Sequence, residues 1–201
     1  MRSCSIALRC CPQFGMSEIR RTIKMRKFPA APWCRSLVVM SIVGMLLLFV
    51  VTYFARGSVP PGSLGGVPRM LVTLLPFIIG SGAALFVVSA YHLDAHGLRI
   101  QRLLWQTSIP LDGLERVWQD RDAMKGSIKV FGNGGLFAYS GVFQNAGLGR
   151  YRAFVTNPQY TVVLRRSRGA VVVTPATPEA FVRQVQAFFP GVRVGAPDQN
   201  P

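Results

Sequence analysis

The stretch "KVFGNGGLFAYSGVFQN", residues 129–145, places four glycines among aromatic residues. After the glycines the sequence alternates, so that Phe137, Tyr139 and Phe143 share one face of an extended strand and small or apolar residues share the other. An Asn-Gly-Gly sequence before this alternation is typical of a tight turn between two strands. The stretch therefore predicts a β-hairpin, with Asn133 and Tyr139 at the border of a surface groove as candidate ligand contacts.

The glycines do not form a nucleotide-binding loop. A phosphate loop presents backbone N–H groups at the start of a helix and carries a following Lys and a Ser or Thr. Here Gly135 is followed by "LFAY", which is strand-forming and contains no lysine. No nucleotide or other cofactor is expected.

Short alternating segments continue on both sides of the hairpin and predict about seven strands in residues 92–190. Frequent Gly, Pro and Asn residues separate them, which is typical of an all-β barrel or sandwich. The segments are "HLDAHGLRIQR", "WQTSIPL", "GSIKVFG", "LFAYSGVF", "RYRAFVT", "YTVVLRRS" and "AVVVTP", while "DGLERVWQD" fits a strand or one helical turn.

The sheet is expected to be capped by one C-terminal helix. Phe181, Val185 and Phe188 recur at helical spacing, Pro178 suits the first helical position, and Thr177 suits the N-cap. A Pro-Gly pair ends the pattern, so residues 191–201 are expected to be a disordered tail.

Two long uncharged segments precede this domain, at residues 36–55 and 70–91. At about 1.5 Å per helical residue, 20 residues match a bilayer core of roughly 30 Å. The first segment is longer than the apolar part of a signal peptide and lacks a clear cleavage site. Residues 36–91 therefore predict a transmembrane hairpin of two helices, on the N-terminal side of the sheet domain.

Charge predicts the orientation of this hairpin. Residues 1–35 hold eight basic residues and one acid, Glu18, whereas the connecting loop holds only Arg56 and Arg69. The positive-inside rule then places both termini in the cytoplasm. Residues 1–35 are expected to form a disordered basic arm, and Met1, Met16 or Met25 remain alternative starts.

The net charge of +15 does not by itself predict nucleic-acid binding. Much of it precedes the first span, where it sets topology, and no nucleic-acid-binding motif accompanies the rest. In the domain, clustered arginines are candidate contacts for anionic lipid headgroups: Arg150, Arg152, Arg165 and Arg166. A solvated basic face beside a negative membrane is the competing interpretation.

Neither a metal site nor an active site is predicted. His92, Asp94 and His96 alternate on one strand, but no further His or Cys in the domain completes a ligand set. All four cysteines lie within the first 34 residues, and the carboxylates show no catalytic pairing. The chain is therefore expected not to be an enzyme.

The second span carries small residues, including Gly80 and Ala84, that allow close helix packing within the hairpin or between copies. Packing between copies leaves an alternative function open, an oligomeric channel or transport accessory subunit. Neither span contains an ionisable residue, which removes the usual polar pathway of a transporter.

From "YHLDAHGLRI" through "KVFGNGGLFAYSGVFQNAGLGRYRAFVTNP" to "VVVTPATPEAFV", roughly residues 90–190, the chain resembles membrane-anchored bacterial proteins with a pleckstrin-homology-like (PH-like) domain. The resemblance implies a PH-like sheet closed by a helix, and a location in the bacterial inner membrane. It implies no enzymatic role and no defined ligand. A protein partner, further copies of the chain or anionic lipids are the expected partners.

Overall fold

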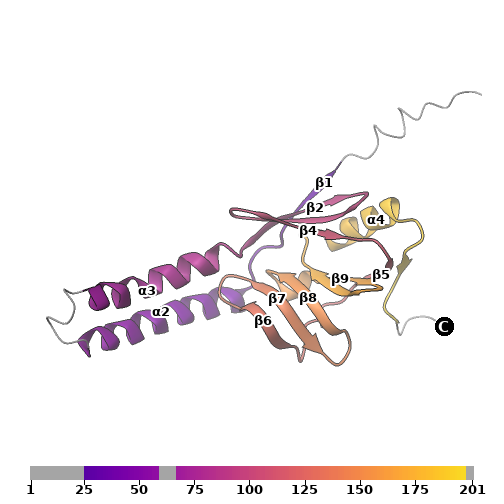
Figure 1. Ribbon diagram of the computed structural model, residues 1–201. Helices are drawn as coiled ribbons and strands as arrows, with labels where there is room; N and C mark the ends of the chain where they lie inside the picture. The colour runs from indigo at the N-terminus through magenta and orange to yellow at the C-terminus, as the bar shows by residue number, and fades with distance from the viewer. Residues whose placement is uncertain (1–24, 59–66, 198–201) are drawn as a thin grey trace, which may run out of the picture.

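The computed structural model describes residues 25–58 and 67–197 as a β-sandwich from which two helices project (Figure 1). The elements in chain order are β1 (Arg26–Pro29), α2 (Arg35–Gly57), α3 (Val67–Ala84), β2 (Val88–Asp94), β3 (Gly97–Arg102), β4 (Gln106–Pro110), β5 (Leu114–Gln119), β6 (Ile128–Gly134), β7 (Tyr139–Asn145), β8 (Gly149–Val155), the 3₁₀ turn η2 (Pro158–Tyr160), β9 (Val162–Arg166), β10 (Gly169–Val173), α4 (Pro178–Phe188) and β11 (Arg193–Val194).

The strands form two sheets that pack face to face. One has the order β1-β2-β3-β4, and the other has the order β11-β5-β9-β10-β8-β7-β6. Most neighbours are antiparallel, while β10 pairs with β8, and β11 with β5, in parallel. Because neither sheet closes on itself, the fold is a sandwich and not a barrel. Nine strands, β2 to β10, lie between Val88 and Val173, where the sequence predicted about seven.

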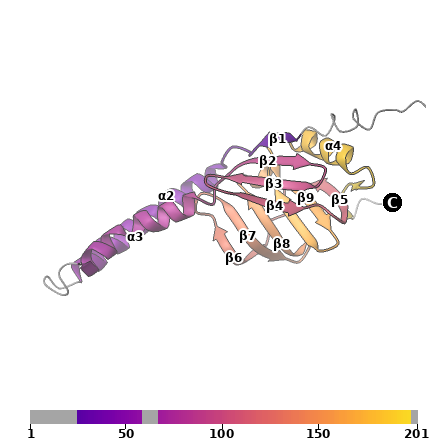
Figure 2. The same ribbon diagram turned by 45° about the horizontal axis from the view of Figure 1, so that its top comes forward.

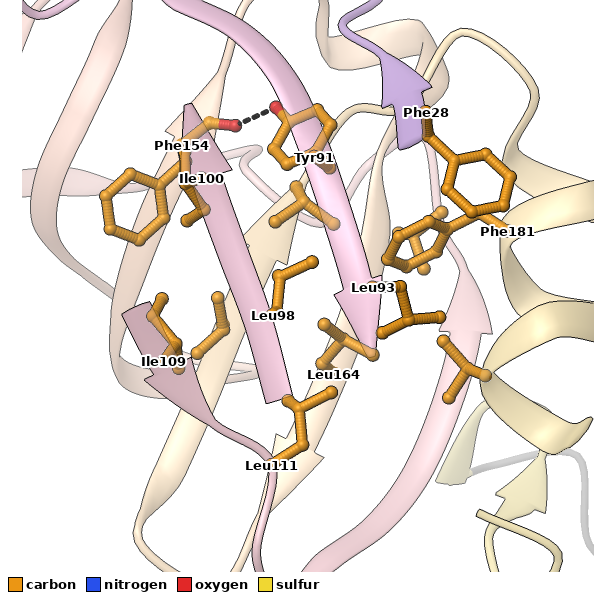
Figure 3. Close-up of a cluster of buried hydrophobic side chains, with 14 of the residues drawn as sticks. Phe28, Tyr91, Leu93, Leu98, Ile100, Ile109, Leu111, Phe154, Leu164 and Phe181 are labelled. Carbon is orange, nitrogen blue, oxygen red and sulfur yellow. Dashed lines mark hydrogen bonds between the residues drawn. The ribbon is translucent and has the colours of Figure 1, made fainter. Parts of the chain in front are cut away.

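The main core fills the space between the sheets and continues under α4 (Figure 3). Phe181 of α4 is fully buried and meets Phe28 of β1 edge to face, with the ring centroids 5.2 Å apart. Tyr91 is also fully buried, and its hydroxyl donates a hydrogen bond to the Phe154 carbonyl at 2.6 Å. The predicted C-terminal helix thus covers one end of the sandwich, as its apolar stripe requires.

A second apolar cluster lies on the opposite face of the seven-stranded sheet. Trp118, Phe143 and Tyr151 form its largest members, and the segment after β5 covers it through Ala123 and Met124. Both faces of this sheet are therefore partly covered by protein.

Helices α2 and α3 lie side by side and extend away from the sandwich (Figure 2). Of the described helices, α2 is the one long and apolar enough to cross a membrane, and α3 contributes a shorter apolar segment, Met70–Ala84. Many of their large apolar side chains are exposed, namely Val39, Met40, Ile42, Leu46, Leu47, Val50, Val51, Phe54, Met70, Leu71, Phe77 and Ile78. Two membrane-spanning helices remain a prediction.

Three predicted boundaries differ from the structure: the end of the second apolar helix, the end of the N-terminal arm and the start of the C-terminal tail. The second apolar segment was expected to remain helical to residue 91, but α3 ends at Ala84 and residues from Val88 onward form β2. Val88, Ala90 and Tyr91 are buried in the domain, so protein rather than lipid covers them. An unbroken apolar run does not distinguish these two kinds of burial.

The predicted disordered arm and tail are wrong where the structure describes them. Arg26–Pro29 forms β1, which pairs with β2 in the register Arg26 to Leu93, and Arg193–Val194 forms β11, which pairs with β5. Only Phe28 of β1 is buried, so the strand has little apolar pattern to reveal it. Residues 1–24 and 198–201 of the arm and tail lie outside the described residues.

The buried Tyr91 hydroxyl makes the stability of the domain sensitive to high pH. Burial raises its pKa to about 12, from an ordinary value of 10. The Tyr91 hydroxyl loses its proton near pH 10 in the unfolded chain but only near pH 12 in the folded chain. The free energy of unfolding that depends on the protonated hydroxyl is therefore complete below pH 10 and is lost as the pH rises to about 12. We expect a loss of roughly 3 kcal/mol in this window. Urea unfolding of the detergent-solubilised chain measures it.

The matched variant is Tyr91→Phe, which keeps the ring but has no ionisable group. It is expected to be less stable near neutral pH, because the Phe154 carbonyl and the Thr174 amide lose their partner. Its unfolding free energy should fall less steeply between pH 10 and 12. Equal alkaline slopes in the two proteins would contradict this assignment.

Candidate functional site

The hairpin of β6 and β7 docks its turn against the start of α2. Ser41 of α2 is buried, and its hydroxyl accepts a hydrogen bond from the Phe137 amide at 2.9 Å. The ring of Phe137 contacts that of Trp33, with the centroids 6.1 Å apart, and Leu136 lies against Gly44. The predicted hairpin is therefore present, and its turn fastens the sheet to the apolar helix.

Phe137 adopts a left-handed backbone conformation to make this contact, with φ at 64°. Among the described residues it is the one non-glycine residue with a positive φ. Such a conformation persists only where the surroundings hold it. The hydrogen bond to Ser41 and the contact with Trp33 supply that support.

The segment between β1 and α2 is fastened to the sandwich as well. Ala31 donates its amide to the Thr174 carbonyl at 2.8 Å and accepts a hydrogen bond from the Thr156 hydroxyl at 2.9 Å. The Asn157 side chain donates to the Pro32 carbonyl at 3.0 Å. The chain thus passes from the domain into α2 without a free linker.

Asn133 serves the hairpin turn and not a ligand. Its side-chain oxygen accepts from the Leu136 amide at 3.1 Å, and its side-chain nitrogen donates to the Leu136 carbonyl. Both ends of the side chain are therefore engaged within the turn, which leaves Asn133 a poor candidate for the predicted ligand contact.

Tyr139 lines a pocket of about 340 Å³ on the outer face of the seven-stranded sheet. We call this the Tyr139 pocket, and it is lined by Arg121, Asp122, Met124, Lys125, Ser127, Tyr139, Phe143 and Pro158. Burial, and to a smaller degree the nearby Cys34 thiol, raise the pKa of Tyr139. Since Cys34 directly precedes α2, the pocket lies at the end of the domain to which α2 is attached.

The side chains that line the Tyr139 pocket include groups that can bind a ligand. Arg121 and Lys125 supply two exposed cations and Tyr139 supplies a phenol, a combination that suits an anionic or polar group. The Ser127 hydroxyl is already hydrogen-bonded to the Tyr151 hydroxyl at 2.6 Å. Sequence reasoning identified Tyr139 from its strand face but missed Arg121, which lies in an irregular segment without periodicity.

The predicted arginines do not form one cluster. Arg165 and Arg166 are consecutive in β9 and point to opposite faces, donating to the carbonyls of Leu148 at 3.1 Å and Pro110 at 2.9 Å respectively. Burial, together with the positive charges of Arg152 and Arg168, lowers the pKa of Arg166.

These arginines also lie toward the end of the sheet away from α2. β7 runs from Tyr139, beside the anchored turn, to Asn145, which pairs with Gly149 at the start of β8. Arg150 therefore lies at the far end, about 17 Å along the strands from Tyr139. The Arg152 guanidinium lies nearer the middle of β8, 5.6 Å from the centre of the Phe154 ring. This placement gives little support to headgroup contacts by Arg150, Arg165 or Arg166.

Other polar residues singled out in the sequence have local partners. Asp94 accepts from the amides of His96 and Gly97 and forms an ion pair with Arg99 at 3.3 Å, while His92 is hydrogen-bonded to Gln101 at 3.0 Å. Within residues 25–58 and 67–197, no group of three His, Cys, Asp or Glu side chains is placed to hold a metal ion.

The small-residue face of α3 packs inside the hairpin at one point. A Cβ on Gly80 would lie 2.8 Å from the Met45 Cε of α2, so the two helices approach closely there. Phe49 and Phe77 meet edge to face farther along, with the centroids 5.5 Å apart. Gly80 thus has a packing role within one chain, whereas Ala84 is only partly buried at the end of α3.

Two features were not predicted from the sequence: an exposed apolar strand and a buried arginine. The edge strand β6 exposes Ile128 and Phe131 by 74% and 75%, with Val130 also exposed, although an apolar strand segment is usually a sign of the core. Arg102, in contrast, is buried between the rings of Phe86, Trp105 and Phe154. The exposure of β6 follows from its place at the edge of the sheet, and the burial of Arg102 follows from rings of three separate segments, and the sequence pattern reveals neither.

One comparison with known proteins finds a match to the domain. Residues 89–187 match the sequence family described as Bacterial PH domain, which spans β2 to nearly all of α4. The predicted resemblance is thereby confirmed for these residues, while α2 and α3 lie outside the match. No curated protein and no solved structure matches the chain.

Proposed function

We propose, from the premise that residues 89–187 are a bacterial PH domain, that the chain is a non-enzymatic interaction module anchored in a membrane. The observation that carries the proposal is the direct attachment of this domain to an apolar helix pair. PH domains commonly bind proteins or lipid headgroups, so the module requires no catalytic group.

The exposed apolar surface of α2 and α3 supports the anchor. Residues such as Leu46, Leu47 and Val51 are more than half exposed in the part of the chain that the structure describes. Transfer of each such side chain from water to an apolar environment is favourable by about 1.5–3 kcal/mol. The hydrocarbon core of a bilayer is such an environment. We assign both helices to a bacterial inner membrane, with α3 as a second span.

The basic residues before α2 support an orientation with both termini in the cytoplasm. In this orientation the PH domain lies at the cytoplasmic leaflet. The Tyr139 pocket offers cations to an anionic group of a lipid or partner, and the exposed edge of β6 offers unpaired backbone groups and apolar side chains to a protein strand.

The alternative of an oligomeric channel or transport accessory subunit has less support. Its predicted contact face includes Gly80, which is already in contact with Met45 of the same chain. Across the described spans α2 and α3 the charged residues lie at the ends, as Arg35 and Arg56 of α2 do, so a polar path through the hairpin is lacking.

The test is a pair of reporter fusions after Pro201, one to a fluorescent protein that matures only in the cytoplasm and one to a phosphatase active only outside it. We expect fluorescence without phosphatase activity, and retention of the chain in membranes washed with alkaline carbonate. A matched control fuses the same reporters after Gly57, at the end of α2, and should reverse the pattern. An active phosphatase after Pro201, or release of the chain by carbonate, would refute the proposal.

A further inference from the structure

The turn between β3 and β4 carries three consecutive large apolar residues at the surface. Leu103 is 64% exposed and Leu104 is 73% exposed, and Trp105 follows with 37%. We call this turn the LLW tip. Exposed leucines at the end of a hairpin lose hydrophobic stabilisation in water, so a contiguous group of them marks a contact surface.

The LLW tip lies directly beside the end of α3. Phe86 follows the last residue of α3 by two positions, and its ring meets that of Trp105 edge to face, with the centroids 5.3 Å apart. Figures 1 and 2 both show the connection between β3 and β4 beside the end of α3 that joins the sandwich. The tip is thus continuous with the apolar surface of the helix pair.

Arg102 fixes the tip in this position. Its guanidinium lies 5.2 Å from the ring centre of Phe86 and 5.6 Å from that of Trp105, and its Nη2 donates to the Ser140 hydroxyl at 3.0 Å. Contacts between cations and aromatic rings are stronger when they are shielded from water, as they are here. The tip is therefore held both by the segment that follows α3 and by β7 of the seven-stranded sheet.

The acidic residues nearest to the LLW tip along the chain lie at the far end of its hairpin. Residues 95–111 contain no acid, and the nearest carboxylates along the chain, Asp94 and Asp112, lie at the opposite end of β3 and β4. Five residues of strand separate the two ends by roughly 17 Å. An acid-free apolar tip suits contact with an anionic leaflet, where a carboxylate would be repelled.

We propose that the LLW tip inserts into the interfacial region of the leaflet from which α3 emerges, as a third, non-spanning attachment of the chain to lipid. The inference rests on the proposed membrane anchor. Leucine side chains at this depth reach the boundary between headgroups and acyl chains, and tryptophan is enriched at that boundary. The partner is the lipid itself, because the tip adjoins the surface that lipid already covers on α3.

The test places a nitroxide spin label on the full-length chain in bilayers of phosphatidylethanolamine and phosphatidylglycerol. The four native cysteines, Cys4, Cys10, Cys11 and Cys34, are replaced by serine. Three single-cysteine variants are then compared, and each alters an exposed position: Leu104→Cys at the tip, Leu47→Cys in α2, and Ala146→Cys in the turn after β7.

We expect collisions of the Leu104→Cys label with a water-soluble nickel complex to be about fivefold rarer than those of the Ala146→Cys label, and collisions with oxygen to be more frequent. The Leu47→Cys label should be the most protected from nickel. If Leu47→Cys is protected and Leu104→Cys is as accessible as Ala146→Cys, the insertion is refuted and the anchor stands.

Two further outcomes also overturn the inference, and they are distinguishable. Exposure of the Leu47→Cys label to nickel would refute the proposed anchor together with the insertion. Protection of the Leu104→Cys label in native membranes, but not in the pure lipid bilayer, would show that a protein and not lipid covers the tip.

Discussion

Gly132→Ala is expected to unfold the β6–β7 hairpin and to destabilise the domain by at least about 3 kcal/mol. Gly132 lies opposite Gly141 in the ladder and has φ at 111°, a conformation that side chains disfavour. A Cβ at this position would lie 2.4 Å from the Ser140 carbonyl oxygen and 2.7 Å from the Gly141 Cα. Both are backbone atoms, so the strands must separate to admit it.

Gly147→Ala is the matched control for this prediction. Gly147 lies in the turn between β7 and β8, and a Cβ there would meet no heavy atom within 4 Å. Gly147→Ala should change the free energy of unfolding by no more than about 0.5 kcal/mol. Urea unfolding monitored by near-ultraviolet circular dichroism measures both variants, and equal stabilities would show that the strands tolerate a Cβ at Gly132.

Phe181→Ala is expected to destabilise the domain by about 3–5 kcal/mol, as for other fully buried phenylalanines. Its ring is fully buried beneath α4 and packs against Phe28, so its removal leaves a cavity where α4, β1 and the core meet. Because β1 leads through Ala31 into α2, the loss is also expected to loosen the attachment of α2 to the domain.

The control for Phe181 lies on the same helix. Gln186 is exposed on α4, and Gln186→Ala should change the stability by less than about 0.5 kcal/mol. A double-mutant cycle with Phe28→Ala separates the contact between the rings from general packing. Two independent losses that simply add would contradict a direct coupling of α4 to β1.

Much of the domain was accessible from the sequence because its elements have clear periodicity. The alternation after Gly135 predicted β7, although the strand begins only at Tyr139 and Phe137 lies in the turn before it. The stripe of Phe181 and Val185 predicted α4. Thr177 does stand at the N-cap, although its side chain makes no capping hydrogen bond. Local pattern determines such elements, and the tertiary structure only places them.

Other elements depended on contacts that no local pattern shows. β1 has one buried residue, Phe28, among basic neighbours that resemble a topogenic arm. Val88 and Tyr91 continue an apolar run that began in α3, and only their burial in the core separates them from it. Long-range packing determines that these residues form strands of the domain.

The candidate site was predictable only in part, for the same reason. Tyr139 was found because its face of β7 follows from the alternation, whereas Asn133 is engaged by a turn whose hydrogen bonds depend on backbone geometry. Arg102 looks like any surface arginine in the sequence, and its burial arises from Phe86, Trp105 and Phe154, which come from three separate segments.

The absence of a free linker between the domain and α2 has a consequence for how partners meet it. A domain on a flexible tether samples a volume that grows with tether length, which dilutes its binding surface. Here the hydrogen bonds of Ala31 and Pro32 hold the connection to the domain, so no flexible tether remains. The Tyr139 pocket therefore keeps a fixed distance and orientation relative to α2. In the proposed membrane orientation, a partner confined to the same leaflet meets this surface at a high effective concentration, whereas a partner whose matching surface lies at another height does not reach it.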